Sequence, residues 1–200
     1  MKKKSLLTAL LLLLAVTCSL SCEDSATSEP GAASSSLEKI PLPDTGPANP
    51  YGVVEDKGIP ITRDGDPKGI KLYADVYRPD SDERFPSLLM ASAYRRETIR
   101  MMPPRPEWLA SQGYVTILVD VLGTGSSEGG WESLSLNEIE YLTWINDDWI
   151  PEQGWSNGKV GMYGGSYMAI LAYLAAGQSP KHLKAIFPCA QGGDGFYHTI

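Results

Sequence analysis

The stretch GMYGGSYMAI, residues 161–170, decides the fold of this chain of 200 residues. Residues 158–163 predict a short buried strand and residues 167–177 an apolar helix, so a strand and a helix meet at Ser166. A serine among small residues at such a junction is typical of a nucleophile elbow, a sharp turn that points the hydroxyl out of the sheet. Met168 replaces the second glycine of the usual Gly-x-Ser-x-Gly. The alternative is a glycine-rich turn that only packs a helix against a strand.

The chemistry expected at such an elbow is attack by the Ser166 hydroxyl on an acyl group. A serine hydroxyl is a poor nucleophile until a base removes its proton, so the site also needs a histidine and an acid. The oxyanion that then forms needs at least two hydrogen-bond donors. The backbone N–H of Tyr167 is expected to be one of them, because it directly follows the nucleophile.

Four segments resemble the Xaa-Pro dipeptidyl-peptidase-like hydrolases (peptidase S15), the family of cocaine esterase and the α-amino-acid ester hydrolases. Residues 155–169 resemble the family's elbow, and YADVYRP at residues 73–79 resembles its second strand. Residues 86–94 resemble its third strand and the loop that carries a tyrosine. Residues 119–129 resemble the loop written D-x-R-G-x-G-x-S-x-G, except that Leu122 stands in place of the arginine. That change concerns the anchoring of the loop rather than the triad.

The resemblance implies an α/β-hydrolase that cleaves ester, amide or Xaa-Pro dipeptidyl bonds of small molecules or short peptides. It also implies that the Tyr94 phenol reaches the oxyanion in place of a second backbone N–H. Taken from the residues alone, Tyr94 is a strand-end tyrosine that anchors a loop. The sequence has no Cys/His cluster and no His-Glu motif, so neither a metal nor a cofactor is expected.

The pattern of the folded part predicts an α/β protein whose mostly parallel sheet carries helices on both faces. Alternating polar and apolar residues on either side of a turn at residues 63–66 predict that the sheet begins with an antiparallel pair. The sheet is expected to be truncated after about its sixth strand. The expected strands are 51–57, 70–78, 87–93, 114–119, 158–163 and 183–189, and the expected helices are 106–112, 135–150 and 167–177.

The N-terminus predicts an exported protein. A lysine-rich start and an apolar run over residues 6–20 have the build of a signal peptide, here residues 1–21. The run ends in Ser-Cys, which resembles a bacterial lipoprotein cleavage site with the lipid on Cys22 and a membrane-anchored location, periplasmic or at the cell surface. Cys18 is the second choice for lipidation. The alternative is an ordinary signal peptide that is cut near Ser21.

The chain beyond the signal is acidic. Residues 22–50 are rich in Ser, Ala, Pro, Gly and Glu and predict a flexible linker to a hydrolase domain over residues 51–200. Without residues 1–21 the chain has 14 basic and 24 acidic residues, hence a net charge of −10, so nucleic acid is not an expected partner. Cys189 lies at the end of an apolar strand and is expected to be buried and inert rather than catalytic.

The sequence leaves the rest of the triad open. His182 is expected at the sheet edge opposite the elbow, and His198 lies on the correct side but precedes any strand that could present the acid. The acid and the histidine are therefore expected beyond residue 200, which would make this chain the N-terminal part of a longer enzyme. Asp120 is expected to anchor a loop. Packing is the favoured role for most of the tryptophans, and Trp131, in the loop after the fourth strand, is the one candidate among them for the active-site side.

Two classes of function follow from these residues. The first is a serine hydrolase that works through an acyl-enzyme. The second is a non-catalytic surface lipoprotein that has kept the scaffold as a binding module. The elbow and Tyr94 favour the first, and the missing acid and histidine favour the second.

Overall fold

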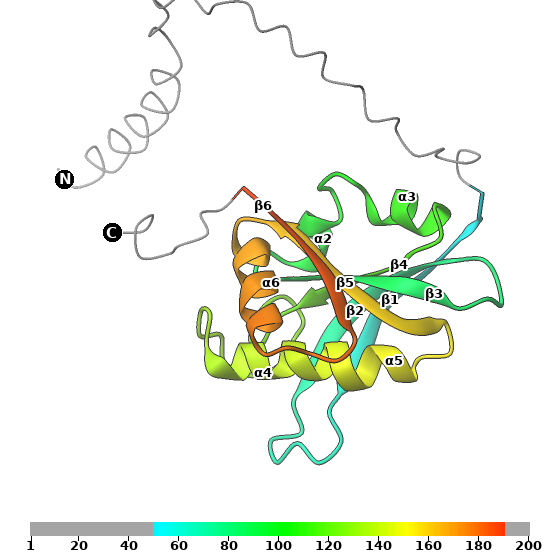
Figure 1. Cartoon of the computed structure of the whole chain (residues 1–200). Coiled ribbons are helices and arrows are strands. Elements are labelled where there is room, and N and C mark those ends of the chain that lie inside the picture. The colour runs from blue at the N-terminus through cyan, green and yellow to red at the C-terminus, as the bar shows by residue number, and fades with distance from the viewer. Residues whose placement is uncertain (1–49, 191–200) are drawn as a thin grey trace, which may run out of the picture. The chain divides into compact units, whose positions relative to one another are not determined.

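The computed structural model describes residues 50–190, which form a six-stranded sheet with helices on both faces (Figure 1). The strand order is β1-β2-β4-β3-β5-β6. β2 pairs antiparallel with both β1 and β4, and all other neighbours are parallel. The strands are β1 Val53–Thr62, β2 Lys71–Pro79, β3 Phe85–Ser92, β4 Val115–Asp120, β5 Ser156–Gly165 and β6 Leu183–Cys189. The helices are α2 Arg96–Ile99, α3 Pro106–Ser111, α4 Leu136–Trp144, the π-helical turn η1 Ile145–Trp149, α5 Ile150–Glu152 and α6 Tyr167–Gly177.

The predicted fold class is confirmed, including the antiparallel entrance and the alternation of strands and helices that follows. β6 and α6 have the predicted bounds. β1 is longer than expected, since it runs to Thr62 instead of ending at residue 57. A register shift between Asp56 and Ile59, at Gly58 with its φ of 66°, lets the strand continue pairing past an irregular residue.

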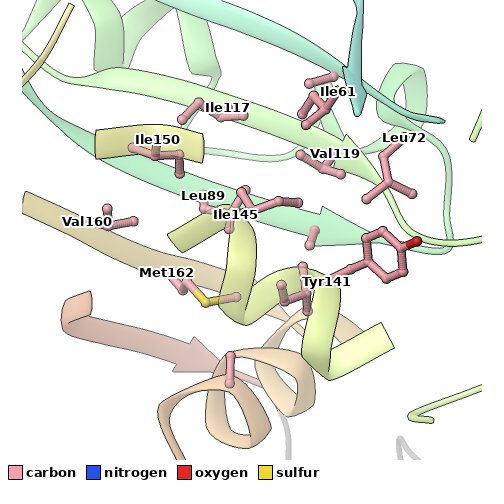
Figure 2. Packing of buried hydrophobic residues seen from close by; sticks show 14 of the residues in the cluster. Ile61, Leu72, Leu89, Ile117, Val119, Tyr141, Ile145, Ile150, Val160 and Met162 are labelled. Carbon is pink, nitrogen blue, oxygen red and sulfur yellow. The ribbon is translucent and has the colours of Figure 1, made fainter. Parts of the chain in front are cut away.

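The larger hydrophobic core lies between the sheet and the helices α4 to α6 (Figure 2). Alternate residues of the central strands point into it, as a strand period of two requires. In β4 these are Val115, Ile117 and Val119, whereas Leu118 points to a smaller cluster on the other face. Helices α2 and α3 cover that second face through Ile99 and Ala110, so both faces of the central strands are buried.

The predicted helix over residues 135–150 is wrong as a single α-helix. It consists of α4, the π-helical turn η1 and the short α5, which continues past Pro151. The extra residue of a π-turn changes the helical phase, so that Ile145 and Asn146 are both fully buried. The Asn146 amide donates to the carbonyl of Leu142 at 2.8 Å, which partly satisfies its polar group in the core.

Several predictions fall outside the described range. The signal peptide, the lipidated Cys22, the linker and His198 all lie beyond residues 50–190. Within that range, no helix is both long and apolar enough to cross a bilayer.

Candidate active site

The elbow forms where β5 meets α6. Ser166 has φ 55° and ψ −122°, a conformation that is sparsely populated for a residue with a side chain and costs about 1–3 kcal/mol. The backbone N–H of Ser166 donates to the carbonyl of Cys189 on β6 at 3.1 Å, which ties the turn to the neighbouring strand. A Cβ on Gly164, whose φ is 157°, would lie 2.4 Å from Cβ of Met168. The glycine is therefore required by the close passage of α6 over the end of β5.

The structure brings Tyr94 to the elbow across 72 residues of sequence. Tyr94 follows the carboxyl end of β3, and its hydroxyl lies 3.2 Å from Oγ of Ser166, within hydrogen-bonding distance. Its backbone N–H donates to the Ser92 hydroxyl at 2.9 Å. The parallel strands β3 and β5 end side by side, so they present both hydroxyls at the same end of the sheet.

A buried ion cluster anchors the chain directly after Tyr94. Arg96 is 5% exposed, and its Nε and Nη1 lie 3.1 Å from Asp120 and 3.4 Å from Asp75. These are ion pairs without good hydrogen-bond alignment, whereas the backbone N–H of Arg96 makes a well-formed bond to Asp120 at 2.8 Å. Arg95, which lies between Tyr94 and Arg96 in the sequence, takes a φ of 72°. Removing one partner from such a buried pair is costly because it leaves an uncompensated charge.

The same Asp120 holds the loop that follows β4, which agrees with its expected role as an anchor. Its carboxylate accepts from the backbone N–H of Ser126 at 3.1 Å, and its carbonyl accepts from the Ser127 hydroxyl at 2.6 Å. Leu122 is 6% exposed and belongs to the larger core. Leu122 therefore contributes apolar packing to this loop, and Asp120 and Ser127 supply its polar anchors.

Replacing Gly125 by alanine is expected to disrupt this anchor. A Cβ on Gly125 would lie 2.1 Å from Oδ2 of Asp120, and its φ of 55° already disfavours a side chain. Gly65 is the matched control, because it also has a positive φ, 75°, but open space around it. We expect Gly65→Ala to lower the free energy of unfolding by about 1–2 kcal/mol. Gly125→Ala should cost about 1–3 kcal/mol more through overpacking, measured by chemical denaturation. Equal losses of unfolding free energy in the two variants would contradict an additional cost from the contact with Asp120.

The side chain of Tyr167 is held by a second buried carboxylate. The Tyr167 hydroxyl lies 2.8 Å from both oxygens of Glu138, which is 2% exposed at the start of α4. The hydroxyl also accepts from the backbone N–H of Leu134 at 3.3 Å and from Nε1 of Trp131 at 3.4 Å. Trp131, the candidate tryptophan for the active-site side, therefore lies beside the residue that follows Ser166.

Burial shifts the ionisation of this pair. Loss of hydration raises the pKa of the Glu138 carboxyl, and the hydrogen bonds from Tyr167 and the Leu134 N–H oppose that rise. Burial also raises the pKa of the Tyr167 phenol, and the nearby Glu138 adds to the effect. The phenol is therefore kept protonated and able to donate.

Two sequence-based expectations about nearby residues have different outcomes. His182 lies before β6, at the end of the sheet opposite the elbow, as expected. Its Nδ1 is 2.7 Å from the carbonyl oxygen of Gly158. Cys189 was expected to be buried, and this is wrong: it is exposed, and its thiol donates to the carbonyl of Gly164 at 3.3 Å. The reason is that Cys189 ends β6, an edge strand whose outer side pairs with no other strand among residues 50–190.

One hollow of the described surface lies away from the elbow. A cavity of about 410 Å³ is lined by residues of α4, η1 and their neighbours, among them Arg63, Trp144 and Lys181. None of its lining residues belongs to the cluster around Ser166. No group of three or more His, Cys, Asp or Glu side chains within residues 50–190 could hold a metal ion.

The strand order and the strained serine between β5 and α6 define this part of the chain as an α/β-hydrolase domain. Residues 68–200 match the X-Pro dipeptidyl-peptidase (S15) family. The chain belongs to that family.

Individual relatives agree with this assignment. Over 155 residues the chain is 31% identical to a cocaine esterase from Rhodococcus sp. (strain MB1 Bresler), an alignment that covers 72% of this chain and 24% of the relative. A CocE/NonD family hydrolase from Staphylococcus aureus superposes with a TM-score of 0.60 at 28% identity, over 67% of this chain and 27% of that one. An α-amino-acid ester hydrolase has the same fold, with a TM-score of 0.54 at 18% identity, over 79% of this chain and 29% of that one. The chain thus spans about a quarter of the length of these relatives.

Proposed function

We propose that the protein is a serine hydrolase that cleaves ester, amide or short-peptide bonds through an acyl-enzyme on Ser166. The observation that carries the proposal is the 3.2 Å approach of the Tyr94 hydroxyl to Oγ of a serine with elbow geometry. A phenol in that position can donate to the oxygen of an acyl group that bonds to Oγ. The backbone N–H of Tyr167 is the second donor, because it directly follows the nucleophile in the first turn of α6.

The proposed reaction has two halves. In the first, Oγ of Ser166 bonds to the acyl carbon, a base takes the hydroxyl proton, and the tetrahedral oxyanion is stabilised by Tyr94 and Tyr167. The bond to the alcohol or amine then breaks, and the leaving group takes the proton. In the second half, water attacks the ester on Ser166, and the acid product leaves with the serine regenerated.

The base and its acid are not among the described residues near Ser166. His182, the histidine within residues 50–190, is at the opposite end of the sheet. The proposal therefore requires a histidine from a part of the protein outside that range. The experiment that tests it is covalent labelling of Ser166 in the full-length protein by a fluorophosphonate, which reacts with activated serines.

The choice among ester, amide and peptide bonds rests on the relatives. Their names describe an esterase, an amino-acid ester hydrolase and X-Pro dipeptidyl-peptidases. Each of these names describes cleavage of an ester or a peptide bond, so small-molecule esters or amides and short peptides are the proposed substrates. A non-catalytic binding module is the less favoured class, because a binding surface gives no reason for a strained serine within hydrogen-bonding reach of a phenol.

We also propose that the mature protein is anchored to a bacterial membrane by lipid on Cys22. The basic start, the apolar run and Ser21 before Cys22 carry this proposal. Cys22→Ala is expected to abolish incorporation of a labelled fatty acid in a bacterial host, and Cys18→Ala, the matched control, to leave it unchanged. Loss of label only in the Cys18 variant would move the anchor to that residue. Unchanged labelling in both variants would refute lipidation.

A further inference from the structure

Glu138 occupies a capping position but does not act as an ordinary cap. It is three residues after Ser135, whose hydroxyl accepts from the Glu138 backbone N–H at 3.2 Å at the start of α4. In a capping box the glutamate side chain would return to the Ser135 N–H. That N–H instead donates to the carbonyl of Glu132, and the Glu138 carboxylate accepts from Leu134 and from the phenol of Tyr167.

A buried carboxylate is an expensive way to stabilise a helix end. Removing its charge from water costs several kcal/mol unless partners compensate, and no ion pair involves Glu138 among the described residues. The N-terminal end of α4 and two hydrogen-bond donors offset part of this cost. A neutral cap would avoid the cost altogether, whereas the carboxylate gives the Tyr167 phenol a charge-assisted hydrogen bond.

Tyr167 connects this carboxylate to both proposed oxyanion donors. Its backbone N–H is one of them, and its ring lies 6.0 Å, centroid to centroid, from the ring of Tyr94, which is the other. Ser166, which precedes α6, makes no side-chain capping bond there. The peptide that enters α6 is held by β5, by the Ser166 N–H bond to Cys189 on β6 and by the side chain of Tyr167.

The same contact joins a surface loop to the elbow. Nε1 of Trp131 donates to the Tyr167 hydroxyl, and Trp131 is 52% exposed. The backbone of this loop passes very close to Gly123, because a Cβ on Gly123 would lie 2.2 Å from the backbone nitrogen of Trp131. Glu138 thus fixes the Tyr167 phenol at a point where a loop, α4 and α6 meet.

We propose that Glu138 is a positioning residue of the oxyanion site, acting on the reaction through the hydroxyl of Tyr167. This inference rests on the proposed function. It assigns Glu138 no contact with the substrate. Its effect is to hold the Tyr167 N–H in the direction that the oxyanion requires, where a small displacement of a donor costs up to about 10²-fold in rate.

The test is a double-mutant cycle in the full-length protein, with Glu138→Gln, Tyr167→Phe and the combined variant. Each single substitution is expected to lower kcat for a p-nitrophenyl ester about 10- to 100-fold with KM little changed. The double variant should be no slower than the slower single variant, because Glu138→Gln removes the charge from the same hydrogen bond that Tyr167→Phe removes altogether. Glu140→Gln is the matched control: Glu140 lies on the same helix, but its side chain is 60% exposed and pairs with Arg63. Its kcat should be unchanged.

Four outcomes separate a positioning role from a structural one and from failure of the proposed function. A Glu138→Gln protein with a lower melting temperature but wild-type kcat per labelled serine would overturn the inference and leave a structural role. Independent, multiplying losses in the double variant would also overturn it. If Glu138→Gln does not fold, Tyr167→Phe, which keeps the carboxylate and the Leu134 contact, decides alone: wild-type kcat refutes the inference, and the expected loss supports it. A wild-type protein that is not labelled at Ser166 would instead refute the proposed function.

Discussion

Ser166→Ala is expected to abolish turnover of a p-nitrophenyl ester by the full-length protein, with a loss of kcat of about 10⁴-fold or more. The reason is that the acyl-enzyme needs Oγ, and no other described hydroxyl occupies the strained turn between β5 and α6. The variant should also lose covalent labelling by a fluorophosphonate, which requires the same oxygen. The substitution removes one atom at an exposed position, so we expect the melting temperature to stay close to that of the wild type.

Ser179→Ala provides the matched control. Ser179 lies just past the C-terminal end of α6, and its φ of 55° equals that of Ser166. Both substitutions exchange serine for alanine at a φ of 55°, one near each end of the same helix. Hydrolysis and labelling should be unchanged in the Ser179 variant. Undiminished esterase activity in Ser166→Ala would exclude Ser166 as the nucleophile.

Tyr94→Phe is expected to lower kcat by about 10²- to 10³-fold, the usual effect of losing one oxyanion donor. The phenylalanine keeps the ring next to Tyr167 and removes only the hydroxyl that lies 3.2 Å from Oγ of Ser166. Because the donor acts on charge that develops in the transition state, KM should change little. Steady-state kinetics with the same ester measure both quantities.

Tyr114→Phe is the control for this experiment. Tyr94 and Tyr114 are both 39% exposed, so the two substitutions are made at equally exposed tyrosines. Tyr114 precedes β4 and thus lies at the sheet end opposite the elbow. Its variant should retain the wild-type kcat. Equal kcat values for the wild type and Tyr94→Phe would leave Tyr94 as a loop anchor, the role that its position in the sequence suggests when taken alone.

These two positions differ in how far the sequence alone could predict them. The elbow is a local feature, because Gly164, Ser166 and the start of the helix follow one another, and the required glycine is visible in the chain. The contact between Tyr94 and Ser166 spans 72 residues, and it came from a family resemblance rather than from any pattern in the residues. Glu138 was missed entirely. Its spacing from Ser135 was the available signal, and that signal indicates a helix cap.

The sequence by itself determined the α/β class, the elbow and the bounds of β6 and α6, because hydrophobic periodicity, glycines and prolines act over a few residues. Tertiary structure decided which distant polar groups meet: Tyr94 with Ser166, Arg96 with Asp75 and Asp120, and Glu138 with Tyr167. It also decided the π-helical turn that buries both Ile145 and Asn146. The physical reason is that a buried polar side chain must find its partner in three dimensions, and the strand order that brings partners together is not encoded in local periodicity.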